Sequence, residues 1–162
     1  MKKSFRIRSF TLLELIIVII ILGILAILGF TQYGRMVERS RGAEAKTILG
    51  DIRKLAYAYR MEEGSLGGGP GGPGGGIQNS DVNLCTVAGQ TDCIPSKAAG
   101  CLPSHYFSYD IGNPIDPTVI ITATRCGAGG KNPPGGVAAG NTLILTSNLV
   151  TGQDGWTGTG GY

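Results

Sequence analysis

Few residues of this 162-residue chain are of a type and spacing that could do chemistry. His105 is the only histidine, and no serine or cysteine nucleophile is recognisably placed beside it. The glycine-rich runs lack the basic residue and the following helix that a phosphate-binding loop needs. We therefore expect His105 to be structural, the protein not to be an enzyme, and no cofactor to be bound.

Four cysteines, Cys85, Cys93, Cys101 and Cys126, are candidates for covalent chemistry. Their even number favours two disulfides in an oxidising compartment, with three possible pairings. A zinc site is disfavoured, because the chain has no C-x-x-C spacing and a single histidine. If the segments 106–110 and 119–124 form a hairpin centred near Pro114, Cys101 lies almost opposite Cys126. We therefore expect the pairs Cys101–Cys126 and Cys85–Cys93.

Glu14 is the remaining candidate, because it is the only charge in the apolar run Ser9–Phe30 (SFTLLELIIVIIILGILAILGF). A run of about 20 apolar residues is long enough to span a membrane as a helix. A charge inside such a helix costs roughly 2.5–3.5 kcal/mol, so we expect Glu14 to have a specific use. The residues before the run include four cations, Lys2, Lys3, Arg6 and Arg8. They are expected to stay in the cytoplasm while the C-terminal part is exported.

Two other kinds of N-terminal segment share some of these features. A conventional secretory signal peptide has a shorter apolar region followed by an A-x-A-like cleavage site. Here the apolar run is too long, and no such site precedes the charged segment Arg35–Arg41. A simple signal anchor, which would hold an exported domain at the membrane, stays open as an alternative.

The apolar pattern continues on one helix face after Phe30. Residues spaced by three and four form an amphipathic stripe: Ala45, Ile48, Leu49, Ile52, Leu55, Ala56 and Tyr59. Since no proline interrupts residues 10–63, we expect one long helix there, with 10–30 apolar all round and 31–63 amphipathic. The glycine-rich segment Gly64–Gly76 ends the helix. We interpret residues 64–104 as a loop that contains glycine-rich sequence and cysteines.

Residues 105–162 are expected to form a small antiparallel sheet. His105–Ile111 alternates in polarity, Thr118–Cys126 is rich in β-branched residues, and Asn141–Ser147 is a third strand. Leu149–Thr157 would add an edge strand that ends at Trp156. One face of the sheet can lie on the apolar stripe. The predicted fold class is therefore α+β, a long N-terminal helix packed on three or four antiparallel strands.

The charge balance of the chain argues against nucleic acid as a direct partner. Four of the 14 basic residues lie in residues 1–9, so a chain beginning at Phe10 has 10 basic against 11 acidic side chains. Beyond Gly64 the only basic residues are Lys97, Arg125 and Lys131. A large basic surface is absent from this part, so direct binding of nucleic acid is not expected.

The stretch FTLLELIIVIIILGILAI resembles the class III signal and N-terminal helix of type IV pilins and of the related type II secretion pseudopilins. Phe10, Thr11, Leu12 and Glu14 match that pattern, and Ser9 stands where the family usually has glycine. The resemblance implies a type IV pilin-like fold, and a leader, residues 1–9, that a prepilin peptidase and methyltransferase removes between Ser9 and Phe10. It also implies N-methylation of Phe10.

The resemblance further implies a structural function. Residues 10–30 would form the core of a filament, a homopolymer assembled by an inner-membrane platform from membrane-held precursors and displayed at the cell surface. Cleavage would give Phe10 a free amine with an ordinary pKa near 8. A neighbour's Phe10 ammonium would then compensate Glu14 and fix the stagger between subunits. The alternatives are a type II secretion pseudopilin acting in protein export and a signal-anchored surface protein.

A calcium site of the kind found in major pseudopilins would need several oxygen ligands near the C-terminal end. Asp154 is the only acid there, in the sequence TGQDGWTG. The Asp-Gly pair favours a tight turn. We therefore predict no metal site.

Overall fold

The structure, a computed structural model, describes residues 10–67, 76–90, 92–112, 114–127, 130–131, 140–159 and 162. The expected leader 1–9, with Ser9, and residues 68–75 of the glycine-rich segment lie outside the described residues. The chain divides into two compact units, Met1–Val37 and Glu38–Tyr162.

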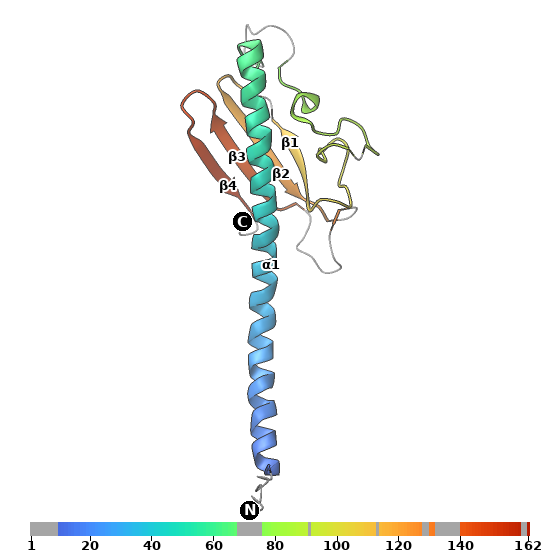
Figure 1. The fold of residues 1–162 in the computed structure, drawn as a ribbon, viewed down its shortest axis with the longest axis vertical. Coiled ribbons are helices and arrows are strands. Elements are labelled where there is room, and N and C mark those ends of the chain that lie inside the picture. The colour runs from blue at the N-terminus through green and yellow to red at the C-terminus, as the bar shows by residue number, and fades with distance from the viewer. Residues whose placement is uncertain are drawn as a thin grey trace, which may run out of the picture. The chain divides into compact units, whose positions relative to one another are not determined.

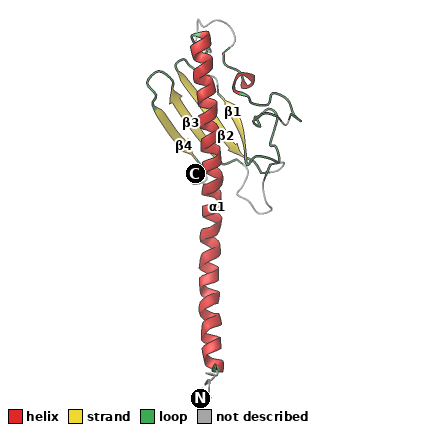
Figure 2. Cartoon of the chain, in the orientation of Figure 1, coloured by secondary structure: helices red, strands yellow, loops and turns green. Residues whose placement is uncertain are grey.

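The helix α1 extends from Leu12 to Glu63 and contains 52 residues (Figures 1 and 2). It begins two residues later than expected, because Thr11 acts as its N-terminal cap. The Thr11 Oγ1 accepts a hydrogen bond from the Glu14 N–H at 3.3 Å. At the other end, Gly64 has a φ of 78° and donates its N–H to the Arg60 carbonyl at 2.9 Å. A glycine in the left-handed region is a common helix terminator.

Four strands follow, β1 (Phe107–Ile111), β2 (Thr118–Arg125), β3 (Thr142–Asn148) and β4 (Asp154–Gly158). They form one antiparallel meander in the order β1-β2-β3-β4, and α1 lies across the sheet in Figure 1. A short 3₁₀ helix, η1 (Asn79–Val82), lies in the preceding loop. The α+β fold predicted from the sequence is confirmed.

Two strands begin at least two residues later than the sequence pattern indicated, and β3 begins one residue later. The strand expected from His105 begins at Phe107, because the His105 N–H turns back to the Leu102 carbonyl at 3.1 Å. The strand expected from Leu149 begins at Asp154, because Leu149–Gly152 forms a turn in which Gly152 has a φ of 70°.

The β1–β2 hairpin has a different register from the predicted one. Phe107 pairs with Arg125 and Ile111 with Ile121, so the hairpin is centred near Asp116 and not near Pro114. Ile115 and Thr118 close the turn with two backbone hydrogen bonds, of 3.2 and 2.7 Å. The alignment that placed Cys101 opposite Cys126 on paired strands was therefore wrong, since Cys101 precedes β1.

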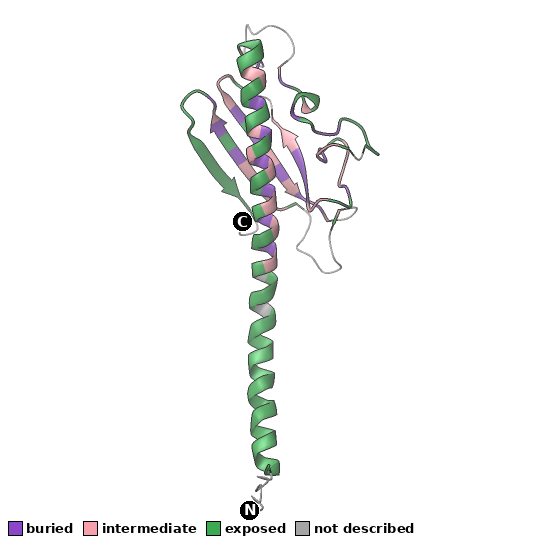
Figure 3. Ribbon diagram, in the orientation of Figure 1, coloured by how far each residue is buried: buried purple, intermediate pink, exposed green. Residues whose placement is uncertain are grey.

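The hydrophobic core lies between the sheet and the second half of α1. Of the predicted stripe, Ala45, Leu49, Ile52 and Ala56 are fully buried, whereas Leu55 is 39 % exposed. Leu55 is about 100° around the helix from Ala56, which places it on the flank of the stripe. Figure 3 shows that the buried residues of α1 occur only in this half of the helix. The sheet contributes inward-facing residues of β1, β2 and β3: Phe107, Tyr109, Val119, Ile121, Leu143 and Leu145.

Candidate functional site

The apolar half of α1 exposes nearly all of its large side chains. Between Leu12 and Phe30 their exposed fractions range from 41 % for Ile16 to 78 % for Leu12. By length and composition this helix is able to cross a membrane. A helix that is apolar on every side needs lipid or other protein chains around it.

Phe10 lies just before the start of this helix, and Glu14 lies in its first turn. Phe10 is 77 % exposed. Thr11 and Glu14 form half of an S/T-x-x-E capping pattern, in which the hydroxyl of Thr11 accepts the Glu14 N–H. Sequence reasoning missed this local role, although the T-x-x-E spacing is itself a signature of a helix N-terminus. A carboxylate in the first turn is also favoured by the helix dipole.

A buried ion pair joins α1 to the end of β2. Arg125 donates from Nε to Glu38 Oε2 at 3.3 Å and from Nη2 to Glu38 Oε1 at 3.4 Å. Its Nη1 donates to the carbonyls of Tyr106 and Cys126, at 2.9 and 3.2 Å. The Arg125 side chain is completely buried. Sequence reasoning missed this pair, although the alternation of β2 places residue 125 on the same face as Val119 and Ile121.

A second ion pair fastens the end of α1 to the β1–β2 turn. Arg60 donates to both oxygens of Asp116, at 2.7 and 3.2 Å, and the Leu66 N–H donates to Asp116 Oδ1 at 3.1 Å. The hydrogen bond from Arg60, aided by the Leu66 N–H and opposed by partial burial, holds the pKa of Asp116 below its ordinary value. This network positions the residues at which the chain leaves the helix.

Asp154, the first residue of β4, fastens that strand to β3 and to α1. It accepts a hydrogen bond from the Ser147 hydroxyl at 2.6 Å and forms an ion pair with Arg53 of α1. The Ser147 hydrogen bond is the main cause of the lowered pKa of Asp154, with Arg53 acting in the same direction. Across the described ranges, no group of three His, Cys, Asp or Glu side chains is placed to hold a metal ion.

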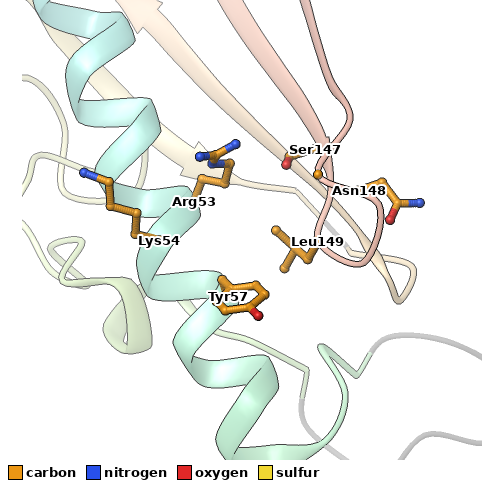
Figure 4. A pocket seen from close by; sticks show the side chains of 7 residues that line it. Arg53, Lys54, Tyr57, Ser147, Asn148 and Leu149 are labelled. Carbon is orange, nitrogen blue, oxygen red and sulfur yellow. The ribbon is translucent and has the colours of Figure 1, made fainter.

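A cleft of about 250 Å³ lies beside this pair (Figure 4). Arg53, Lys54 and Tyr57 of α1 form one side, and the segment 147–149 with Gly152 forms the other. Its walls are the helix and the end of β3, so the cleft marks the edge of the helix–sheet contact.

Two disulfides occur in the structure. Cys85–Cys93 closes a loop with a Cα–Cα distance of 5.2 Å, inside which Gln90 Oε1 accepts the Thr86 N–H at 2.8 Å. Cys101–Cys126 has a Cα–Cα distance of 5.9 Å and ties the segment before β1 to the residue after β2. His105 lies in the same segment, where its Nδ1 is 2.8 Å from the Ser104 hydroxyl, so its position is that of a turn residue.

Comparison with known proteins decides the family. Residues 5–30 match the family described as the prokaryotic N-terminal methylation motif. The chain is 31% identical over 150 residues to the type IV major fimbrial protein FimA of Dichelobacter nodosus, which covers 90% of this chain and 83% of that protein. The chain belongs to the type IV pilin family. A fimbrial protein of D. nodosus is 36% identical to this pilin over 150 residues, which again cover 90% of this chain and 83% of that protein.

A third relative comes from another organism. The type IV major pilin protein PilA of Myxococcus xanthus is 31% identical over 149 residues, 85% of this pilin and 64% of PilA. No solved structure matches this pilin significantly. The relatives are structural subunits, so this pilin is a structural subunit and not an enzyme, and the pseudopilin alternative is not favoured.

Proposed function

We propose that this pilin is made as an inner-membrane precursor and is cut by a prepilin peptidase between Ser9 and Phe10, after which Phe10 is N-methylated. The methylation motif at residues 5–30 supports the processing step. The exposed apolar residues of α1 support the membrane stage, since residues 10–30 match the thickness of a bilayer.

The processed subunit then polymerises with copies of itself into a filament on the cell surface. Moving the apolar half of α1 from lipid into a filament exchanges one apolar surrounding for another, so hydrophobicity alone supplies little driving force. Close packing and polar contacts must favour the filament instead. Glu14 is the one residue of the span that can supply an ionic contact.

The single observation behind this proposal is the isolated carboxylate of Glu14. No described residue forms an ion pair with it. The free amine that cleavage creates at Phe10 of a neighbouring copy would compensate Glu14 in the apolar core. Since one axial offset alone brings the two groups together, the pair would set the stagger between subunits. Removing one partner of a buried pair costs about 3–5 kcal/mol.

The test compares Glu14→Gln and Glu14→Leu with Glu62→Gln, which removes an acid from the exposed end of the same helix. We expect both Glu14 variants to reach the membrane at normal levels and to yield at least about tenfold fewer sheared filaments. Glu62→Gln should assemble normally. Normal filament yield from both Glu14 variants would refute the pairing.

A further inference from the structure

The two edges of the sheet differ in how their backbone groups are bonded. At the β1 edge, Tyr109 donates its N–H to the Pro95 carbonyl at 2.7 Å and accepts the Lys97 N–H at 2.9 Å. The Ile111 N–H donates to Asn79 Oδ1 at 3.5 Å. Within the described part of the chain, no segment pairs with the outer side of β4, and every residue of that strand is exposed (Figure 3). The sheet is therefore covered at one edge and open at the other.

The open edge presents the backbone groups of alternate residues. The Gln153 carbonyl accepts the Asn148 N–H at 2.9 Å, so the residue before β4 is bonded to β3. Bonded and unbonded positions alternate along an antiparallel ladder. The backbone N–H and C=O groups of Asp154, Trp156 and Gly158 therefore point away from β3, in line for bonds with another strand.

β4 lacks the features that usually keep an edge strand from pairing with another chain. Such features are an exposed lysine, a proline or a bulge. The sequence of β4 is DGWTG, and its register with β3 is regular. Its one charged residue, Asp154, already has a hydrogen bond with Ser147 and an ion pair with Arg53. Trp156, the single tryptophan of the chain, is 43 % exposed. This composition favours the addition of a strand.

The spacing of the outward-facing residues selects a second copy of β4 as that strand. They are symmetric about Trp156. If two β4 strands lie antiparallel with Trp156 opposite Trp156, Asp154 of each copy faces Gly158 of the other. Any other centre leaves an outward-facing residue without a partner in the second β4. A centre at Asp154 would also set two carboxylates opposite each other, whereas the centre at Trp156 pairs two aromatic rings.

We propose that two copies of this pilin pair through β4 in this register, which joins two four-stranded sheets into one. The two copies are related by a two-fold axis at Trp156. Such a contact uses the same surface on both copies and is complete with two, whereas a filament needs a contact that repeats from one subunit to the next. The pairing is therefore separate from polymerisation and goes beyond the proposed function.

The test uses the full chain in detergent over a range of protein concentrations. Sedimentation gives the mass of the complex, and hydrogen exchange measured by NMR follows single backbone N–H groups. Pairing gives the Trp156 N–H an acceptor that it lacks in the single chain. We expect its exchange to slow by about tenfold or more where the pair forms. The Thr157 N–H faces β3 in both states, so its exchange should change much less.

Four variants separate the β4 contact from other causes of association. Trp156→Pro removes the outward N–H, and an edge strand accepts proline at such a position. Trp156→Lys places two ammonium groups opposite each other. Trp156→Phe keeps the backbone groups and an aromatic ring, and Thr146→Lys adds a lysine at an exposed position of β3. We expect Trp156→Pro and Trp156→Lys to raise the dissociation constant by about tenfold or more, and the two controls by less than about threefold.

Two results would overturn the inference. One is a Trp156 N–H whose exchange rate does not depend on protein concentration. The other is a Trp156→Pro variant that pairs as tightly as wild type, since the contact would then lie elsewhere in the chain. Circular dichroism shows whether each variant is folded. If Trp156→Pro is not, the comparison of Trp156→Lys with Thr146→Lys decides, and equal dissociation constants for these two variants would overturn the inference.

Discussion

Two aspartates each form an ion pair with one arginine of α1. Asp116 in the β1–β2 turn pairs with Arg60, and Asp154 at the start of β4 pairs with Arg53. Both carboxyl groups have a pKa below the ordinary value. In each case the native state therefore binds its proton less readily than the unfolded chain does. The stability that these aspartates contribute is present above the ordinary pKa, near 3.9, and is lost as the pH falls through the lowered native pKa.

This linkage predicts acid sensitivity. We expect the free energy of unfolding of the full chain in detergent to fall as the pH drops below about 4. Asp116→Asn should be less stable than wild type at pH 7 and should show a shallower loss on acidification. Unfolding by urea, followed by circular dichroism at several pH values, measures both effects. Parallel pH profiles for the two proteins would contradict the assignment.

Two glycines of α1 allow a matched comparison. A Cβ at Gly42 would lie 2.6 Å from Cδ1 of the Tyr162 ring, whereas a Cβ at Gly50 would meet nothing within 4 Å. Gly50→Ala should stabilise the helix by about 1 kcal/mol. Gly42→Ala forces the Tyr162 ring to move, so it should be less stable than Gly50→Ala by about 1–3 kcal/mol. Equal thermal unfolding midpoints would show that Tyr162 adapts without cost.

Among the elements, the two disulfides link different parts of the chain. Cys85–Cys93 lies within the loop, and Cys101–Cys126 joins that loop to the end of β2. The Cys101–Cys126 pair spans 25 residues and the Cys85–Cys93 pair spans 8. Because a larger closed loop restricts the unfolded chain more, removing the first pair should cost about 3.5 kcal/mol and removing the second about 2.5 kcal/mol. Double serine variants of each pair, compared by urea unfolding, test the order. Peptide mass spectrometry without reduction tests the pairing itself.

The sequence predicted these elements better than it predicted their register. Spacings of three and four residues and β-branched runs indicated the helix and the strands. The β1–β2 turn was misplaced, because Gly112, Pro114 and Pro117 all favour a turn and the pattern alone does not choose among them. The hydrogen bonds between Ile115 and Thr118, which close the hairpin two residues later, depend on the folded backbone.

At the scale of the whole molecule, long-range contacts were the part that sequence could not supply. The pair between Glu38 and Arg125 joins residues 87 positions apart. The alternation of β2 places Arg125 on the inward face, but its partner Glu38 became known only with the helix in place. The N-terminal motif is different in kind, because Phe10, Thr11 and Glu14 are close in sequence. The family could therefore be predicted from that short stretch.

We propose that this pilin works as a processed, polymerised subunit. Mass spectrometry of the intact protein and its peptides, taken from the sheared and sedimentable fraction of the source cells, tests it most directly. We expect a chain that begins at Phe10, carries one added methyl group on its N-terminus and has all four cysteines oxidised. A protein found only in membranes and still beginning at Met1 would contradict it, and the signal-anchor alternative would then be favoured.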